Sequence, residues 1–273
     1  MRKASIGFKV LDIFFKALII IFSVSPIYAC IIVSLTPYSN LLSPQLFPHY
    51  FDIGNYAAAF KNIAPYMLNS FLYAIMTICF TLFVSIPVAY ICARYNFKGK
   101  SPVVFGLLLT QMISGIVLLP SLYSIYNNFD LLDNRFSLVF TFTGVNIALT
   151  VMLLMGFFKT IPYAIEEAAY IDGINFTMLL VRIIVPISLP AIAVSAIFTF
   201  INSYNEFVIP LFLLTSPEIK TLTLRLYSYM SDTTVLWNIV GAAALIGMLP
   251  PVLIFMFFQK YIISGITSGA VKG

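Results

Sequence analysis

The sequence predicts an all-α polytopic membrane protein with six transmembrane helices. Hydrophobic residues fill 61% of its 273 positions and charged residues only 9%, whereas soluble domains carry about 25% charged residues. The mean hydropathy is +1.00. The apolar residues form continuous runs without the alternation of a β-barrel, and a continuous apolar run satisfies its backbone in lipid by folding as a helix.

Six apolar runs are long enough to span a bilayer, which takes about 20 mostly apolar residues in a helix. We place these spans at Ala17–Thr36, Tyr66–Ala93, Val103–Tyr126, Phe136–Phe158, Ile187–Leu214 and Trp237–Ile262. Together they predict a single transmembrane domain over residues 1–273, in which residues 1–16 form an N-terminal segment outside the membrane.

The distribution of Lys and Arg predicts that both termini are cytoplasmic, because short cytoplasmic loops carry an excess of these residues. In this orientation four of the fifteen lie outside, at Lys61, Arg135, Lys220 and Arg225. Eleven lie inside, at Arg2, Lys3, Lys9, Lys16, Arg94, Lys98, Lys100, Lys159, Arg182, Lys260 and Lys272. The net charge of +5 follows this bias, so it indicates no nucleic-acid partner.

The sequence offers no catalytic, metal or cofactor site. His49 is the only histidine, and the three cysteines lie in apolar segments, where they are typical of small buried side chains. The stretch RYNFKGKS ends like a nucleotide-binding loop but has Arg94 where that loop needs its first glycine. We therefore interpret it as a basic cytoplasmic turn, and we expect the chain not to hydrolyse ATP by itself.

The stretch EEAAYIDG, Glu166 to Gly173, places three of the ten acidic residues in eight positions on the predicted cytoplasmic side. Pro162 suits the first turn of a helix, and Gly173 permits the left-handed residue that ends one. Asn175 can cap a second short helix that runs to Pro186. The pattern predicts a helix–turn–helix whose small face, Ile165, Ala168 and Ala169, inserts into a cleft on another protein. An interfacial helix resting on lipid is the alternative.

The run EAAYIDGINFTMLLVRIIVP, Glu167 to Pro186, matches the pattern E-A-A-x-x-x-G-x9-I-x-L-P except that Val185 replaces the leucine. In this it resembles permease subunits of binding-protein-dependent ABC importers. The segments FINSYNEFVIPLFLLTSPEIKTLTLRL, Phe200 to Leu226, and SGITSGAVKG, Ser264 to Gly273, resemble the maltose-type carbohydrate permease subfamily. The resemblance is strongest over residues 155–273.

The resemblance implies a function in carbohydrate import at the bacterial plasma membrane. The partners implied are a second permease in a heterodimer, a cytosolic ATPase dimer that binds the ATP and magnesium, and an extracytoplasmic binding protein. Residues 160–186 would form a cytoplasmic coupling loop whose helix acts as a lever in a groove of an ATPase subunit. The coupling residues implied are Glu166, Glu167, Ala168, Ala169, Asp172 and Gly173, with the carboxylates meeting polar groups on the groove rim.

Polar residues in the fifth span form a second candidate site. A helix would place Asn202, Asn205 and Glu206 on one face, and an ionisable residue at membrane depth is a functional candidate. This face could line the substrate pathway, or it could form an interhelical hydrogen-bond cluster that holds two subunits together. Weaker candidates are Asn69, Gln111 and Asn146.

The outer loops and the tail extend these expectations. Residues 37–65 and 215–236 are long for connections between spans, and the resemblance implies that they receive the binding protein; packing on the bundle is the alternative. The tail, residues 264–273, would reach the ATPase interface through Gly269, Lys272 and Gly273, or else remain free in the cytoplasm.

A secondary transporter or channel subunit is the competing functional class. Such a protein would carry internal repeats or a chain of buried acids for a coupling ion, and the sequence has neither. The identity of the solute stays open among monosaccharides, oligosaccharides and glycerol phosphates.

Overall fold

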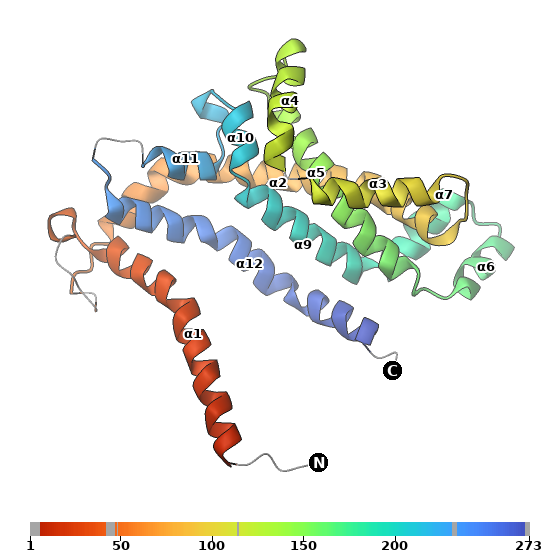
Figure 1. Cartoon of the computed structure of the whole chain (residues 1–273), viewed down its shortest axis with the longest axis horizontal. Helices are drawn as coiled ribbons and strands as arrows, with labels where there is room; N and C mark the ends of the chain where they lie inside the picture. The colour runs from red at the N-terminus through yellow and green to blue at the C-terminus, as the bar shows by residue number, and fades with distance from the viewer. Residues whose placement is uncertain (1–5, 42–46, 48, 114, 231–233, 271–273) are drawn as a thin grey trace. The chain divides into compact units, whose positions relative to one another are not determined.

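A computed structural model of the chain describes residues 6–41, 47, 49–113, 115–230 and 234–270, with residues 6–10 and 261–270 described by their backbone alone. All regular structure in these ranges is helical. The chain divides into two units: residues 1–64 with 225–249, and residues 65–224 with 250–273. The long helices α2 (Gly54–Arg94) and α12 (Trp237–Ala270) each run through both units (Figure 1).

The first unit joins α1 (Ile6–Leu35), the short 3-10 helix η1 (Tyr38–Asn40), and the first turns of α2 and α12. Its polar centre is Asn55, whose Nδ2 donates to Ser34 O at 3.0 Å and whose Oδ1 accepts from Asn238 Nδ2 at 2.9 Å. A Cβ added to Gly241 would lie only 3.3 Å from Cys30 O. Small residues thus allow α12 to pack closely on α1, as is usual between membrane helices.

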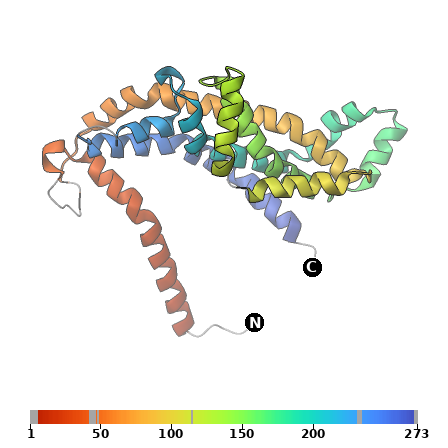
Figure 2. The ribbon, with the colours of Figure 1, turned by 45° about the horizontal axis from the view of Figure 1, so that its top comes forward.

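The second unit is built around α5 (Arg135–Phe158). In the most apolar part of this helix, 61% of the residues are buried. Helices α3 (Lys100–Met112), α9 (Leu189–Asn205) and α10 (Val208–Leu213) pack against it, and Figures 1 and 2 agree in placing α3 and α9 alongside it. The unit also contains α4 (Gly115–Asn128), the 3-10 helix η3 (Pro217–Ile219) and the start of α11 (Leu222–Ser228). Because α5 is contacted by other helices on most sides, its apolar residues are not confined to one face.

A chain of short helices follows α5 at one end of the second unit (Figure 1). These are α6 (Tyr163–Ile171), α7 (Phe176–Leu179), the π-helix η2 (Leu180–Ile184) and α8 (Val185–Ile187). The helical segment Phe176–Ile187 meets α9 at an angle of 81°. Pro186 therefore does not end the second short helix as predicted, and the break comes at Ser188, just before Pro190.

Four helices in the described part of the chain, α1, α2, α5 and α12, are long and apolar enough to cross a membrane. Two bent pairs, α3 with α4 and Phe176–Ile187 with α9, raise the number to six if each pair is one span. The fifth predicted span is wrong as a continuous helix, because α9 ends at Asn205 and a new helix starts at Val208. The helix that contains the second predicted span, α2, begins at Gly54 instead of Tyr66.

Candidate functional site

Helix α6 begins and ends where the sequence predicts. Pro162 occupies its N-cap, and Gly173 follows its C-cap with a φ of +78°. Gly173 N donates to Tyr170 O and Ile174 N donates to Ala169 O, both at 3.1 Å, which is the paired hydrogen bonding of a Schellman turn. Asn175 caps α7 by accepting from Met178 N at 2.9 Å. The helix–turn–helix is thereby confirmed.

A buried ion pair attaches α6 to the end of α2. Arg94 Nη2 lies 2.6 Å from Glu166 Oε1, and the two side chains are 3% and 8% exposed. The same Nη2 donates to Ile161 O at 2.7 Å, and Tyr90 OH donates to Glu166 Oε2 at 2.7 Å. The carboxylate is thus held by a charge and a hydroxyl, which a buried acid needs because its desolvation is costly.

Aromatic rings complete this contact, which we call the junction and define as Tyr90, Arg94, Ile161, Tyr163 and Glu166. The Arg94 guanidinium lies 4.4 Å from the centre of the Tyr163 ring, within range of a cation–π interaction. The fully buried Tyr90 ring packs edge-on against two phenylalanines, Phe158 at the end of α5 and Phe176 at the start of α7. The junction therefore joins four helices at one point.

The carboxylate of Glu166 is buried within the chain. Its predicted part in coupling stays a prediction, and in this structure the carboxylate contacts α2 and not the surface of α6. The small face is also divided, because Ala169 is buried and Ile165 packs on the core of the second unit, while Ala168 is exposed. The side of α6 that the sequence pattern assigned to a partner is therefore occupied by packing against α2 and α5 of the same chain.

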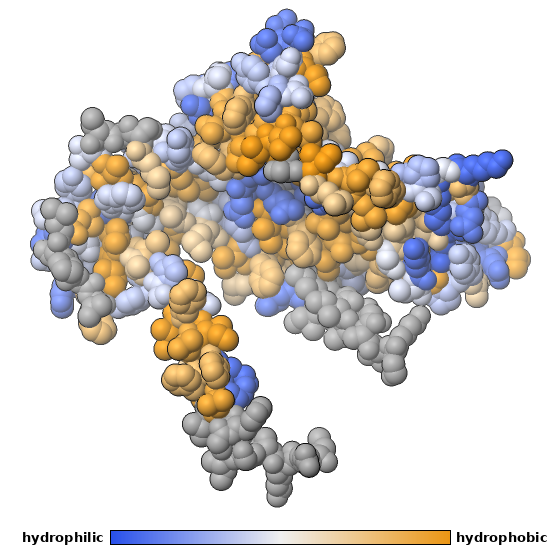
Figure 3. All heavy atoms as spheres, viewed as in Figure 1, coloured by the Kyte–Doolittle hydropathy of each residue, from blue (hydrophilic) through white to orange (hydrophobic). Residues whose placement is uncertain are grey.

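The opposite side of α6 is open in this chain. Besides Tyr163 of the junction, it carries the side chains that the structure leaves accessible, namely Ala164, Glu167, Ala168, Tyr170, Ile171 and Asp172. Ile171 is 85% exposed, so this side offers an apolar side chain as well as two carboxylates. We call this set the outer face of α6. Hydrophilic residues are frequent at the end of the second unit where α6 lies (Figure 3).

Tyr95 links the outer face to the turn after α2. Its hydroxyl lies 3.3 Å from that of Tyr170. This hydrogen bond, assisted by burial, raises the pKa of Tyr95 to about 12, so the phenol stays protonated at neutral pH. The contact gives α6 a second, weaker attachment to the end of α2.

Two of the three polar residues of the fifth span share a helix face: Asn202 and Asn205 lie three residues apart in α9, and both are exposed. Asn202 Nδ2 also donates to Asn146 Oδ1 at 3.2 Å, between α9 and α5. Glu206 adopts an extended conformation beyond the helix. Its Oε1 accepts from Val208 N at 2.9 Å and Ile209 N at 3.2 Å, so the carboxylate caps α10. The break follows the polar stretch 202–206. It was not predicted because apolar residues flank that stretch on both sides and 187–214 is long enough for one span.

The three weaker polar candidates differ in their surroundings. Asn69 donates to Glu218 O at 2.8 Å and Lys220 O at 3.1 Å, holding the segment after α10 against α2. Asn146 donates to Phe142 O within α5, and Gln111 is exposed on α3. Two of the three thus have structural partners in the chain.

The loop before α5 is tied to the same segment by Asp133. Its Oδ1 accepts from Thr215 N at 2.8 Å and Ser216 N at 2.9 Å, and its Oδ2 accepts from the Ser216 hydroxyl. Burial raises the pKa of the Asp133 carboxyl, but the hydrogen bonds from Ser216 and Thr215 outweigh it, and the pKa is lowered overall. The start of the predicted loop 215–236 is therefore packed on the second unit.

The last helix extends beyond the end of the sixth predicted span at Ile262. The backbone of α12 stays helical to Ala270, through Gly265 and Gly269. Lys272 and Gly273 lie outside the described residues. The predicted contact of this tail with an ATPase interface stays a prediction.

Comparisons with known proteins place this arrangement among transporters. Residues 85–268 match the family described as "Binding-protein-dependent transport system inner membrane component". A sulfoquinovosyl glycerol transport system permease protein, SmoH of Agrobacterium fabrum, is 28% identical over 83% of this chain and 80% of its own length. The maltose/maltodextrin transport system permease protein MalG of Photorhabdus laumondii is 32% identical over 76% of this chain and 72% of its own length.

A solved structure has the same fold. It is a chain of a bacterial ABC transporter involved in the import of the acidic polysaccharide alginate, with a TM-score of 0.82 and 21% sequence identity. The match covers 96% of this chain and 99% of that one.

Proposed function

The chain belongs to the family of binding-protein-dependent transport system inner membrane components, and from this premise we propose that it is the permease subunit of an ATP-driven importer of a carbohydrate or related polyol. It is a multi-pass protein of the bacterial plasma membrane. The transport systems of its relatives, for sulfoquinovosyl glycerol and for maltose and maltodextrin, support the solute class. The chain itself is the non-catalytic subunit.

The proposed topology has six spans with both termini in the cytoplasm. Each bent helix pair counts as one span, and the excess of Lys and Arg sets the orientation. In this arrangement α6, the junction and the loop 160–186 lie on the cytoplasmic side. The outer loops 37–65 and 215–236 then face the extracytoplasmic binding protein.

We assign to α6 the role of coupling helix. A cytosolic ATPase dimer would bind ATP and magnesium, close, and carry the two coupling helices of a permease heterodimer between inward-facing and outward-facing arrangements. The observation that carries this proposal is the division of α6: Glu166 is pinned in the buried junction, while Glu167, Ala168 and Ile171 are accessible. A lever needs both a rigid attachment and a free contact surface.

The attachment defines the path of the motion in this chain. Because Arg94 is the last residue of α2 and Tyr90 packs on α5 and α7, a displacement of α6 acts directly on these three helices. The carboxylates of Glu167 and Asp172 would meet polar groups on the rim of the groove, and Gly173 would set the angle at which the chain leaves α6. Asn202, Asn205 and Glu206 stay proposed for the solute pathway; Asn202 and Asn205 are exposed, and Glu206 is half-buried.

The test is a charge reversal on the outer face of α6. In the complete reconstituted transporter, we expect Glu167→Lys to abolish uptake and the ATP hydrolysis stimulated by the binding protein, with unchanged membrane insertion. Asp12→Lys is the matched control, because it makes the same charge change at an exposed acid on the same proposed side of the membrane.

Two outcomes would count against the proposal. Normal coupling in Glu167→Lys would remove α6 as the lever. Solute uptake by the permease pair without its ATPase subunits would favour the competing class, a secondary transporter or channel.

A further inference from the structure

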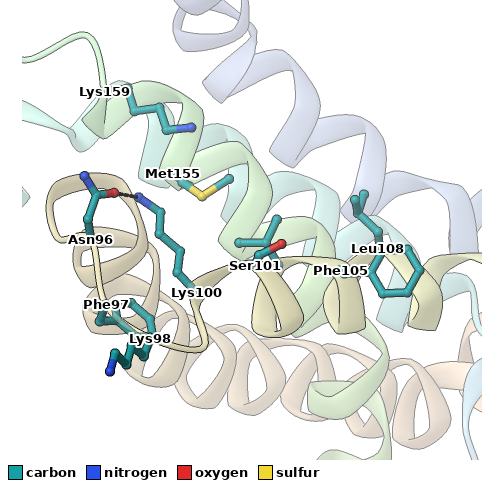
Figure 4. Close-up of a pocket in the computed structure, with 10 residues that line it drawn as sticks. Asn96, Phe97, Lys98, Lys100, Ser101, Phe105, Leu108, Met155 and Lys159 are labelled. Atoms are coloured by element: carbon teal, nitrogen blue, oxygen red, sulfur yellow. Dashed lines mark hydrogen bonds between the residues drawn. The ribbon is translucent and has the colours of Figure 1, made fainter.

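A pocket of about 780 Å³ lies between the turn after α2, the first half of α3 and the end of α5. It belongs wholly to the second unit. Figure 4 shows its lining, which comprises Asn96, Phe97, Lys98, Lys100, Ser101, Val104, Phe105, Leu108, Met155 and Lys159. Neither the junction nor the outer face of α6 shares a residue with it.

The two ends of the pocket differ in chemistry. One end presents three lysines, Lys98, Lys100 and Lys159, and the other presents the apolar side chains of Phe105 and Leu108 (Figure 4). Lys100 Nζ donates to Tyr95 O and Asn96 Oδ1, both at 3.1 Å. Because an ammonium group has three donors, Lys100 is positioned by the turn and keeps one donor for a ligand.

Among the residues that the structure describes, no acidic side chain neutralises the positive charge of this end. No Asp or Glu lines the pocket. In the described ranges the ion pairs are Lys16 with Asp12 and Arg94 with Glu166, so none of the three pocket lysines takes part in one. Three like charges around one hollow repel each other and favour an anionic ligand.

The apolar end identifies the kind of anion. Phe105 is 59% exposed and Leu108 is 42% exposed. A small soluble anion bound at the lysines would not cover these two apolar side chains. The pocket also lies at the end of two candidate spans, at Lys100 of α3 and Lys159 after α5. Basic pockets between transmembrane helices on the cytoplasmic side suit lipid headgroups, and acyl chains suit the apolar wall.

We propose that this pocket binds an anionic phospholipid, with its phosphodiester at Lys98, Lys100 and Lys159 and an acyl chain along Phe105 and Leu108. The cytoplasmic leaflet as its source rests on the proposed orientation. Binding itself requires neither ATP nor solute, so the lipid site can be tested whether or not the transport function holds.

The experiment measures lipid retention by the complete transporter in detergent. It is titrated with phosphatidylglycerol or phosphatidylcholine of matched acyl chains, and bound lipid is counted by native mass spectrometry. We expect preferential retention of phosphatidylglycerol. Each neutralised lysine should weaken it by about fivefold, the equivalent of the usual contribution of one basic residue near an anionic membrane. The triple change Lys98→Gln, Lys100→Gln and Lys159→Gln should therefore weaken it by about a hundredfold if the three contributions are independent.

Matched variants separate the site from general charge. Changing Lys3, Lys9 and Lys16 together to Gln removes the same charge elsewhere and should leave retention intact. Arg in place of all three pocket lysines should preserve retention, whereas Phe105→Gln with Leu108→Gln should reduce it without loss of charge.

Several results would overturn the lipid site. The first is equal lipid retention in the triple Gln variant of the pocket and the triple Gln variant of Lys3, Lys9 and Lys16. The second is retention of phosphatidylcholine equal to that of phosphatidylglycerol. The third is displacement of phosphatidylglycerol by inorganic phosphate, which would indicate a site for a soluble anion. Loss of an ATPase or permease partner from the triple pocket variant, with lipid retained, would assign the lysines to a protein interface instead.

Discussion

The inner and outer faces of α6 differ more than their shared sequence pattern suggests. The inner face carries Glu166 and Ala169, both buried, with the carboxylate held by Arg94 and Tyr90. The outer face, one residue away at Glu167 and Ala168, is open. Two adjacent glutamates thus have opposite environments, because successive residues of a helix point about 100° apart.

This difference separates two properties of a lever. The inner face determines how firmly α6 is attached, and changes there should alter the stability of the permease. The outer face determines what α6 contacts, and changes there should alter association and coupling while the permease stays folded. Four predictions test this separation.

The largest effect is expected from Arg94→Leu. It leaves the Glu166 carboxylate buried without a counter-charge, which costs about 3–5 kcal/mol. Thermal unfolding of the purified transporter should reveal this loss. The double change Arg94→Leu with Glu166→Leu should recover most of it, because an apolar pair can replace a buried ion pair at little cost. Arg182→Leu, at an exposed position, is the control. Equal destabilisation in the single and double variants would contradict the ion pair's importance.

A smaller loss is expected from Tyr90→Phe, which keeps the ring contacts and removes only the hydrogen bond to Glu166 Oε2. A hydrogen bond to a charged group contributes about 1.5–3 kcal/mol. The same unfolding measurement applies, with Tyr123→Phe on exposed α4 as the control. If the hydroxyl acts only through Glu166, Tyr90→Phe should have little effect in the Arg94 and Glu166 double Leu variant.

On the outer face, Ile171→Ala should weaken binding of the ATPase subunits by about 1–2 kcal/mol, as for an apolar side chain at the centre of an interface. The permease should unfold at an unchanged temperature, because Ile171 is 85% exposed. Co-purification of the ATPase subunits at increasing dilution measures the first quantity. A lowered unfolding temperature with normal association would reverse the assignment of the two faces.

The smallest effect concerns Asp133, which lies outside α6 and provides a reference loop. Because its carboxyl pKa is lowered in the folded protein, its stabilisation is present above the usual carboxyl pKa of 3.8 and is lost as the pH falls through the folded value. Hydrogen-exchange protection at Thr215 and Ser216 should therefore decrease in acid. Asp133→Asn should remove this dependence and leave protection in α6 unchanged; acid sensitivity that survives the substitution would exclude Asp133 as its source.

Short-range features were predictable from the sequence. The ends of α6 depend on Pro162, Gly173 and Asn175, because a proline, a left-handed glycine and a capping amide act within one helical turn. The all-helical class follows equally directly, since a bilayer excludes unpaired backbone groups. The position of Glu206 was not predictable in the same way, because a short polar stretch inside an apolar run is also compatible with a continuous helix.

The membrane class, the apolar runs and the ends of α6 could thus be predicted from the residues alone. The packing of the helices was needed to show that Glu166 faces inward, that Ala169 belongs to the core and that Lys98, Lys100 and Lys159 line one pocket. The physical reason is distance along the chain. Arg94 and Glu166 come from separate helices, and no local rule of periodicity or capping selects a partner that becomes a neighbour only when α2, α5 and α6 pack together.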